Sequence, residues 1–265
     1  MSYYTNDFGV NYASKRISPD EVRTILAEAY DLGVDKVVSI SNNIAEARRN
    51  IAMAKKQPRF HYVIGCHPHN AKSFMYKDIA FLEENLGGSA CWGIGECGLD
   101  FNRDFSPRDV QARVFRTQVQ IAKKHQKPMY IHCRDAYTEL IEILLEEDYH
   151  CGLIHCFTGD LDQALYFCER GFKLGITGYI TNKSRSKATR EAIKSPKIAL
   201  TDLITETDAP WMVVKPKTRE GGSRPEDTSS IVQTIAQLKG LDEIECGKAL
   251  YDNSNTFLAP EIDLL

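Results

Sequence analysis

The sequence predicts a single (β/α)₈ barrel, and three observations support this fold class. Eight short apolar segments alternate with longer amphipathic segments along the chain. Several of the short segments are almost continuously apolar, which is typical of parallel strands covered on both faces. The length of 265 residues fits one barrel, since such domains commonly contain about 250 residues. We therefore expect one α/β domain of this type over residues 1–265, with an open doubly wound parallel sheet as the alternative.

Start signals delimit several of the helices. Ser18 and Pro19 are typical of an N-cap followed by a first helical residue, and Ser106 with Pro107 repeats this pattern. The predicted strands are residues 7–11, 36–41, 61–66, 91–97, 128–133, 151–156, 172–179 and 203–208. The predicted helices are residues 19–32, 45–56, 106–126, 137–147, 161–170, 187–194, 228–239 and 241–253.

The composition is that of an ordinary globular protein, with 43% apolar and 26% charged residues. The net charge of −3 excludes a bulk polycation, so any nucleic-acid contact must come from a local basic patch or a bound metal. No segment approaches the roughly 18 apolar residues of a membrane span, and residues 1–10 do not resemble a secretion signal. We interpret the eight cysteines as free thiols of a cytoplasmic protein, or of a nuclear one if the source is eukaryotic.

Four polar residues stand at the C-terminal ends of four different predicted strands. They are Glu96, His132, His155 and Asp208. A barrel brings such strand ends together on one face, where active sites are built. Imidazoles and carboxylates together bind magnesium, manganese or zinc. Buried ion pairs of the core are the alternative explanation, but a charge inside an apolar segment costs several kcal/mol unless it is paired or metal-bound.

Cysteines follow three of the proposed ligands directly, at Cys97, Cys133 and Cys156. Neighbouring residues on a strand point to opposite faces, so we expect these thiols to be small buried groups and not ligands of the same metal. His67 and His69 flank Pro68 after the third strand. His67 is either a residue of the site or part of a turn fixed by the proline.

Six short motifs follow one another along the chain. They are Asp-Phe-Gly-Val-Asn at residues 7–11, Gly-Cys-His-Pro-His at 65–69, Ile-Gly-Glu-Cys-Gly-Leu-Asp-Phe at 94–101, His-Cys-Arg at 132–134, His-Cys-Phe-Thr-Gly at 155–159 and Glu-Thr-Asp-Ala-Pro at 206–210. Together these motifs resemble the TatD family of metal-dependent deoxyribonucleases, almost from end to end. The resemblance implies a (β/α)₈ barrel that hydrolyses DNA phosphodiester bonds, as a 3′→5′ exonuclease on single-stranded DNA or 3′ ends, with a role in DNA repair or degradation.

The resemblance also implies roles for individual residues. Glu96, His132, His155 and Asp208 look like the metal ligands, with Mg²⁺ as the expected ion and Mn²⁺ or Zn²⁺ as alternatives. Asp208 and Glu96 are the expected catalytic residues, and Asp208 is the candidate that orients or deprotonates the attacking water. Many members of the wider family carry two histidines where this chain has Gly9 and Asn11, so we expect one firmly held cation and a weaker second one. The expected substrate contacts are His67, Asn11, Arg134 and Arg224.

Two basic runs follow the last two predicted strands and are candidates for phosphate contacts; solvated surface loops are the alternative for each. We expect a monomer that needs no protein partner and no membrane. Two other functions compete: an amidohydrolase-like enzyme acting on a small amide, ester or lactone, and a non-catalytic nucleic-acid-binding protein on a decayed barrel. The basic runs are Lys183, Arg185, Lys187 and Arg190, and then Lys215, Lys217, Arg219 and Arg224.

Overall fold

Eight parallel strands follow one another in the sheet in chain order, from β1 to β8. The computed structural model describes residues 3–13, 17–216 and 220–259. Phe8 in β1 (Thr5–Val10) forms a parallel bridge with Glu206, the residue that follows β8 (Leu203–Thr205). The first strand therefore pairs with the segment that directly follows the last one, as the order of a (β/α)₈ fold requires. The predicted (β/α)₈ fold class is confirmed.

The chain divides into two compact units. The terminal unit combines Met1–Val38 with Cys156–Pro260, and the central unit is Ser39–His155. Within the residues that the structure describes, no helix is both long enough and apolar enough to cross a membrane.

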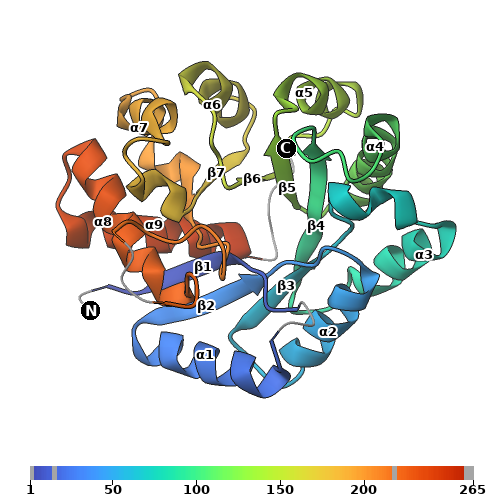
Figure 1. Cartoon of the computed structure of the whole chain (residues 1–265), viewed down its shortest axis with the longest axis horizontal. Coiled ribbons are helices and arrows are strands. Elements are labelled where there is room, and N and C mark those ends of the chain that lie inside the picture. Colours follow the sequence, from blue (N-terminus) through green and yellow to red (C-terminus); the bar gives the residue numbers. More distant parts are fainter. Residues whose placement is uncertain (1–2, 14–16, 217–219, 260–265) are drawn as a thin grey trace. The chain divides into compact units, whose positions relative to one another are not determined.

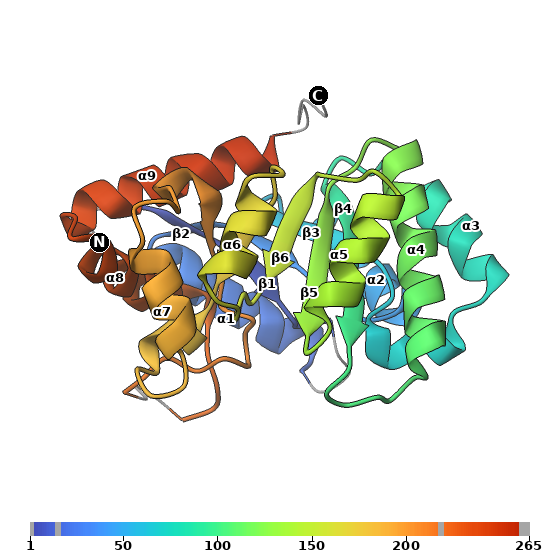
Figure 2. The same cartoon turned by 90° about the horizontal axis from the view of Figure 1, so that it is seen from above.

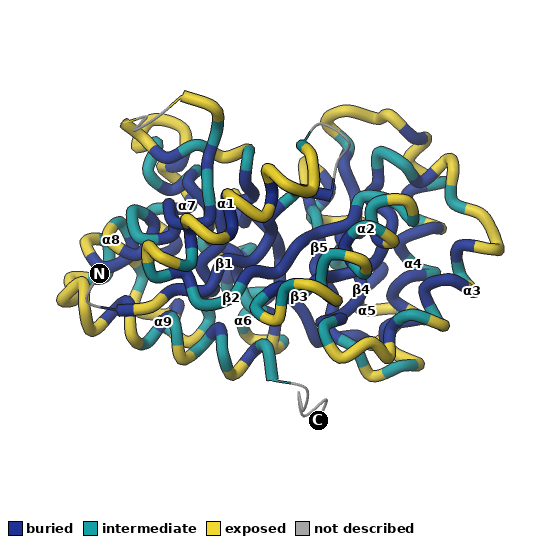
Figure 3. Tube along the Cα trace, turned by 90° about the horizontal axis from the view of Figure 1, so that it is seen from below, coloured by how far each residue is buried: buried dark blue, intermediate teal, exposed yellow. Residues whose placement is uncertain are grey.

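In the central unit, four strands pair in parallel, and α4 packs against β4 (Figures 1 and 2). All ten residues of β4 are buried, as expected for a strand covered on both faces. Figure 3 shows the same contrast between the dark strands and the mixed colours of the helices outside them. The elements are α2 (Ile44–Ala54), β3 (Phe60–Ile64), the 3₁₀ turn η1 (Pro68–Ser73), α3 (Tyr76–Asn85), β4 (Cys91–Asp100), α4 (Arg108–Lys124), β5 (Met129–Arg134), α5 (Tyr137–Glu146) and β6 (Gly152–His155).

In the terminal unit, β7 and β8 pair in parallel, and α8 packs against α9. Ser18 caps α1 as predicted, since its side chain accepts a hydrogen bond from the Glu21 backbone N–H. Asp160 and Gln163 form a reciprocal capping box at the start of α6. The elements are β1, α1 (Pro19–Asp31), most of β2 (Val34–Ser39), α6 (Leu161–Cys168), β7 (Lys173–Ile176), η2 (Gly178–Thr181), α7 (Lys187–Lys194), η3 (Leu200–Asp202), β8, η4 (Pro225–Asp227), α8 (Thr228–Lys239) and α9 (Glu243–Leu258).

Two sequence expectations about helices were wrong. Helix α3 was not predicted at all. Ser106 does not cap α4, whose N-cap is Pro107. The Ser106 hydroxyl instead donates to the His69 carbonyl oxygen and accepts from the Lys72 backbone N–H, at 3.1 and 3.0 Å. It therefore ties the η1 turn to the segment before α4.

Candidate metal centre and active site

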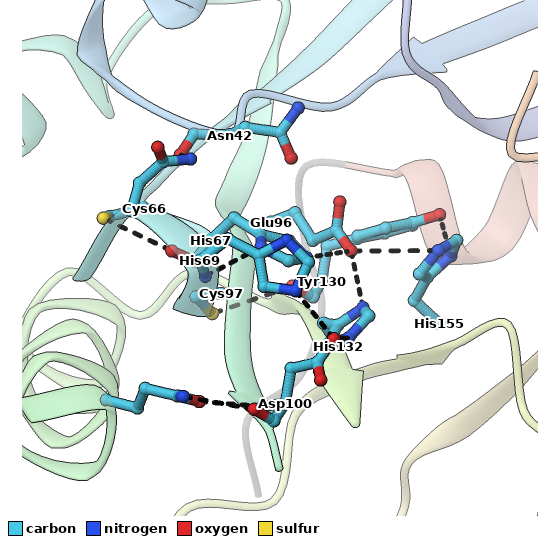
Figure 4. Close-up of polar contacts among 12 residues, drawn as sticks. Asn42, Cys66, His67, His69, Glu96, Cys97, Asp100, Tyr130, His132 and His155 are labelled. Atoms are coloured by element: carbon cyan, nitrogen blue, oxygen red, sulfur yellow. Dashed lines mark hydrogen bonds and ion pairs between the residues drawn. The ribbon is translucent and has the colours of Figure 1, made fainter. Parts of the chain in front are cut away.

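The carboxylate of Glu96 lies at the centre of a cluster of imidazole rings in the central unit (Figure 4). Its Oε1 atom is 2.9 Å from His132 Nδ1, 3.5 Å from His67 Nε2 and 3.8 Å from His155 Nε2. Glu96 is only 3% exposed. Burial alone would raise the pKa of this carboxyl, but the imidazoles, His67 and His132 foremost, outweigh burial and hold the pKa below its usual range. The structure therefore concentrates negative charge and ring nitrogens at one buried point.

The strand register brings these residues together. His132, two residues before the end of β5, pairs with His155 at the end of β6. Between Ile94 and Cys97 the β4–β5 register shifts, and Glu96 lies within that irregularity. Such bulges commonly re-aim a side chain next to an active site. Gly98 then runs so close to β5 that a Cβ atom there would lie 1.9 Å from the His132 carbonyl oxygen, so this position requires glycine.

The Nε2 atom of His67 faces Glu96, 3.5 Å from its Oε1 atom. Its Nδ1 accepts the backbone N–H of His69 at 3.1 Å, so the neutral ring carries its hydrogen on Nε2, the atom that faces Glu96. Burial lowers the pKa of His67 to about 3, which keeps the ring neutral. The atoms of His67, Glu96 and His132 lie within 4.8 Å of one another, but a nitrogen that carries hydrogen offers no lone pair to a metal.

The other two rings each present one nitrogen to Glu96 and have a partner for the second. His132 Nε2 is 3.3 Å from Oδ2 of Asp100, which also lies 2.8 Å from His69 Nε2. His155 Nδ1 is 2.5 Å from the Tyr130 hydroxyl. Burial would lower the pKa of His132, but its hydrogen bonds to Asp100 and Glu96 raise it above the usual value. The nitrogens left facing Glu96 are Nδ1 of His132 and Nε2 of His155.

This donor set fits a divalent cation. One carboxylate oxygen and two imidazole nitrogens converge, and mixed nitrogen and oxygen ligands suit several first-row metals as well as magnesium. Histidine rings are neutral when they bind a metal, so they would leave the buried Glu96 carboxylate without a compensating charge. A bound cation supplies that charge. Glu96, His132 and His155 of the central unit therefore form a donor set that fits a divalent cation.

Comparison with known proteins identifies the family. The profile of a family described as TatD related DNase matches residues 6–259. The chain belongs to the TatD family. The protein named 3′-5′ ssDNA/RNA exonuclease TatD from Citrobacter rodentium is 32% identical over 253 residues, covering 94% of this chain and 95% of that protein. Its counterpart from Salmonella typhimurium is 32% identical over 242 residues, covering 89% of this chain and 92% of that protein.

Solved structures agree with this assignment. The crystal structure of a TatD homologue from Escherichia coli matches with a TM-score of 0.88 at 28% identity, covering 97% of this chain and 98% of that one. A TatD family hydrolase from Entamoeba histolytica matches with a TM-score of 0.86, covering 98% and 100%. At 21% identity this second match supports the fold alone.

Asp208, the fourth predicted ligand of the TatD site, lies in the terminal unit, whereas Glu96 lies in the central unit. Asp208 is 8% exposed and has a φ of 55°, a left-handed conformation that is uncommon outside glycine. The segment before it is anchored, because the Asp7 carboxylate accepts two 2.7 Å hydrogen bonds from the N–H and hydroxyl of Thr207. Burial, the largest effect, raises the pKa of Asp7 well above its usual value.

The predicted substrate contacts differ in their surroundings. Arg134 is exposed at the end of β5. Asn11 is partly buried, and its backbone N–H donates to the Ala209 carbonyl oxygen at 2.7 Å. Arg224 forms an ion pair with Glu28, with its Nη1 atom 2.5 Å from Oε2. A phosphate at Arg224 would therefore compete with this carboxylate.

Three residues of the first basic run are exposed: Lys183, Arg185 and Lys187. We call these three residues the β7 basic run. Arg190 instead donates to the Ile180 carbonyl oxygen at 2.8 Å. In the second run Lys215 is exposed, whereas Lys217 and Arg219 lie outside the described residues.

All eight cysteines are free, and the three that follow proposed ligands are buried, as predicted. The Cys97 thiol donates to the Tyr130 carbonyl oxygen at 3.7 Å, and the Cys156 thiol is 3.2 Å from the Thr177 hydroxyl. Burial raises the pKa of Cys97 well above its usual value. The Cys97 thiol is therefore protonated, and both thiols have partners of their own.

Sequence reasoning missed Asp100, His69 as its partner, and Tyr130. A signal for two of them was present. Asp100 is an even number of residues from Glu96 on β4, and Tyr130 is two residues before His132 on β5. Because residues i and i+2 of a regular strand share a face, both could have been assigned to the site from their spacing.

Proposed function

We propose that this TatD-family protein is a divalent-metal-dependent deoxyribonuclease that shortens single-stranded DNA from its 3′ end. The observation that carries the proposal is the convergence of His132 Nδ1 and His155 Nε2 on the buried Oε1 atom of Glu96. This arrangement suits a cation, and the matched relatives are named as 3′-5′ exonucleases of single-stranded DNA and RNA. Under this proposal the whole chain serves as one catalytic domain.

The metal site of this proposal consists of Glu96, His132 and His155 with Asp208 as a fourth ligand, and magnesium is the native ion. A divalent cation bound there supplies a Lewis acid that stabilises negative charge on a phosphoryl oxygen and makes a water easier to deprotonate. Asp208 orients that water and accepts its proton as a general base. Manganese and zinc are the alternative ions, because the same ligand types accept both.

The remaining residues bind and orient the substrate. The Nε2–H of His67 lies 3.5 Å from Glu96 Oε1 and donates to an oxygen of the scissile phosphate when the substrate binds, a role that its occupied Nδ1 favours. Asn11, Arg134 and Arg224 contact the strand near the cleaved bond. The β7 basic run neutralises phosphates further along the strand and gives binding that tolerates any sequence and weakens with salt. A monomer in the cytoplasm is sufficient for this chemistry.

The test is digestion of a single-stranded DNA oligonucleotide labelled at its 5′ end, with Mg²⁺, by wild type and by Glu96→Ala. Glu142→Ala is the matched control, since Glu142 is exposed on α5. We expect a ladder that shortens from the 3′ end with wild type and control and is absent with Glu96→Ala. Equal digestion by all three proteins would refute the site.

The same assay separates the alternatives. An RNA oligonucleotide of the same sequence measures whether ribose is accepted, as the names of the relatives suggest. Absence of digestion with Mg²⁺ and with Mn²⁺, together with turnover of an ester or lactone panel, would refute the nuclease in favour of a small-molecule hydrolase.

A further inference from the structure

His132 and His155 each present one nitrogen to Glu96, and each has its other nitrogen in contact with a buried side chain. For His132 the holder is Asp100, with Oδ2 3.3 Å from Nε2. For His155 the holder is Tyr130, with its hydroxyl 2.5 Å from Nδ1. A neutral imidazole carries one hydrogen, so a partner at one nitrogen determines whether the other has a lone pair.

Asp100 is built to act only as an acceptor. It is 1% exposed, and its Oδ1 atom accepts the backbone N–H groups of Asn102 and Arg103 at 3.0 and 2.8 Å. The side chain of Gln111 on α4 holds the Asp100 backbone by accepting its N–H at 2.9 Å and donating to its carbonyl oxygen at 3.1 Å. Two backbone N–H groups therefore hold the Asp100 carboxylate, and Gln111 holds the Asp100 backbone. Because the carboxylate can only accept, Nε2 of His132 must supply the hydrogen in its contact with Oδ2.

Tyr130 holds His155 in a comparable way. The tyrosine is fully buried on β5, and its ring centroid lies 4.8 Å from that of His155. Its hydroxyl can accept a hydrogen as well as donate one, so it is compatible with hydrogen on His155 Nδ1 and a lone pair on Nε2. Nε2 is the atom that faces Glu96.

We propose that Asp100 and Tyr130 are positioning residues of the two histidines. Asp100, which only accepts, fixes the hydrogen of His132 on Nε2, and Tyr130 fixes the rotation of the His155 ring so that its Nε2 faces Glu96. The proposal rests on the metal site of the proposed function, in which a cation would be held by Nδ1 of His132 and Nε2 of His155. Partners of this kind orient metal-binding histidines and raise their basicity, and their loss typically weakens metal affinity by about 10–100-fold.

The first test measures Mn²⁺ affinity by calorimetry without DNA. Asp100→Asn keeps an oxygen for the Asn102 turn but can present an amide NH₂ to His132, which favours the wrong tautomer; Tyr130→Phe removes only the hydroxyl. We expect each to weaken Mn²⁺ binding by about 10–100-fold. Asp78→Asn and Tyr149→Phe are matched controls, because these buried residues hold the Met75 N–H and the Lys127 carbonyl oxygen, not a histidine.

The second test reads the tautomers directly. Long-range ¹H–¹⁵N spectra of wild type labelled with ¹⁵N-histidine and loaded with Zn²⁺ should show hydrogen on Nε2 of His132 and on Nδ1 of His155. Hydrogen on the opposite nitrogen of either ring would overturn the proposal, as would Mn²⁺ affinities of both variants equal to those of their controls. Because this readout uses wild type, it remains decisive even if Asp100→Asn does not fold.

These outcomes are distinct from those that test the nuclease. A protein with the expected tautomers and Mn²⁺ affinities that leaves DNA intact would refute the proposed function and support the positioning roles. A protein that digests DNA while both variants bind Mn²⁺ like their controls would refute the positioning roles and support the nuclease.

Discussion

Gln118 on α4 tests how the segment that carries His67 is anchored to the helix layer. Its side-chain amide binds both backbone groups of Cys66, which follows β3 by two residues. Oε1 accepts the Cys66 N–H at 2.7 Å, and Nε2 donates to the Cys66 carbonyl oxygen at 3.1 Å. Gln118 is fully buried, and Cys66 is 4% exposed. We predict that Gln118→Met, which keeps the side-chain length, strongly destabilises the protein.

The magnitude follows from the two backbone groups that lose their partner. Each buried group left without a hydrogen bond costs about 1–3 kcal/mol, so the free energy of unfolding should fall by about 2–6 kcal/mol. The change in packing adds little, because methionine is flexible and has a similar shape. His67, which follows Cys66 directly, should also lose its fixed approach to Glu96.

The assay is urea denaturation of wild type, Gln118→Met and the control Gln120→Met. Gln120 lies on the same helix but is exposed, and its amide donates to the Glu147 carboxylate. The control should change stability by less than about 0.5 kcal/mol, as is usual for surface positions. If both variants unfold at the same urea concentration with equal slopes, Cys66 does not depend on Gln118 and the reasoning fails.

Three further predictions concern the strand register, the thiols and the basic surface. Gly98→Ala should abolish Mg²⁺-dependent digestion and lower thermal stability, because the added methyl collides with the His132 carbonyl; unchanged activity would contradict the register. Burial raises the pKa of Cys66 and of Cys91 to about 12. Their contribution to stability should therefore be complete below about pH 8.5 and lost as the pH rises toward 12. Iodoacetamide at pH 8 should label both roughly 10³ times more slowly than an exposed thiol, and mass spectrometry of fast labelling would disprove this. Reversing the β7 basic run to glutamate should raise KM for DNA and flatten its salt dependence; an unchanged KM at low salt would exclude a role for that run.

The barrel could be predicted because its signals are local and repeated. Helices α7 and α8 have the predicted bounds, since each lies between clear breaks in the apolar pattern. Helix α3 lacked such a signal. Its N-cap is Met75, whose side chain cannot accept a backbone N–H. The helix start is held instead by the Asp78 carboxylate, which accepts the Met75 backbone N–H. A helix that begins without a capping side chain is hard to recognise in the sequence.

The convergence of Glu96, His132 and His155 could also be predicted, because neighbouring parallel strands bring their C-terminal ends together. Which nitrogen of each ring faces Glu96 could not be predicted from the sequence. It depends on the rotation of each imidazole and on where the Asp100 carboxylate is held by the turn at Asn102. Neither is a function of spacing along the chain.

The sequence did not indicate how far β4 alone determines the site. Glu96 faces the ring nitrogens, Gly98 allows β5 to approach, and Asp100 holds the far nitrogen of His132. One strand thus supplies a proposed ligand and also the group that orients a proposed ligand on its neighbour. Because the two are joined by the same backbone, a slip of β4 against β5 would displace both together. Retention of the β4–β5 register is therefore a stronger requirement for metal binding than any single contact of His132.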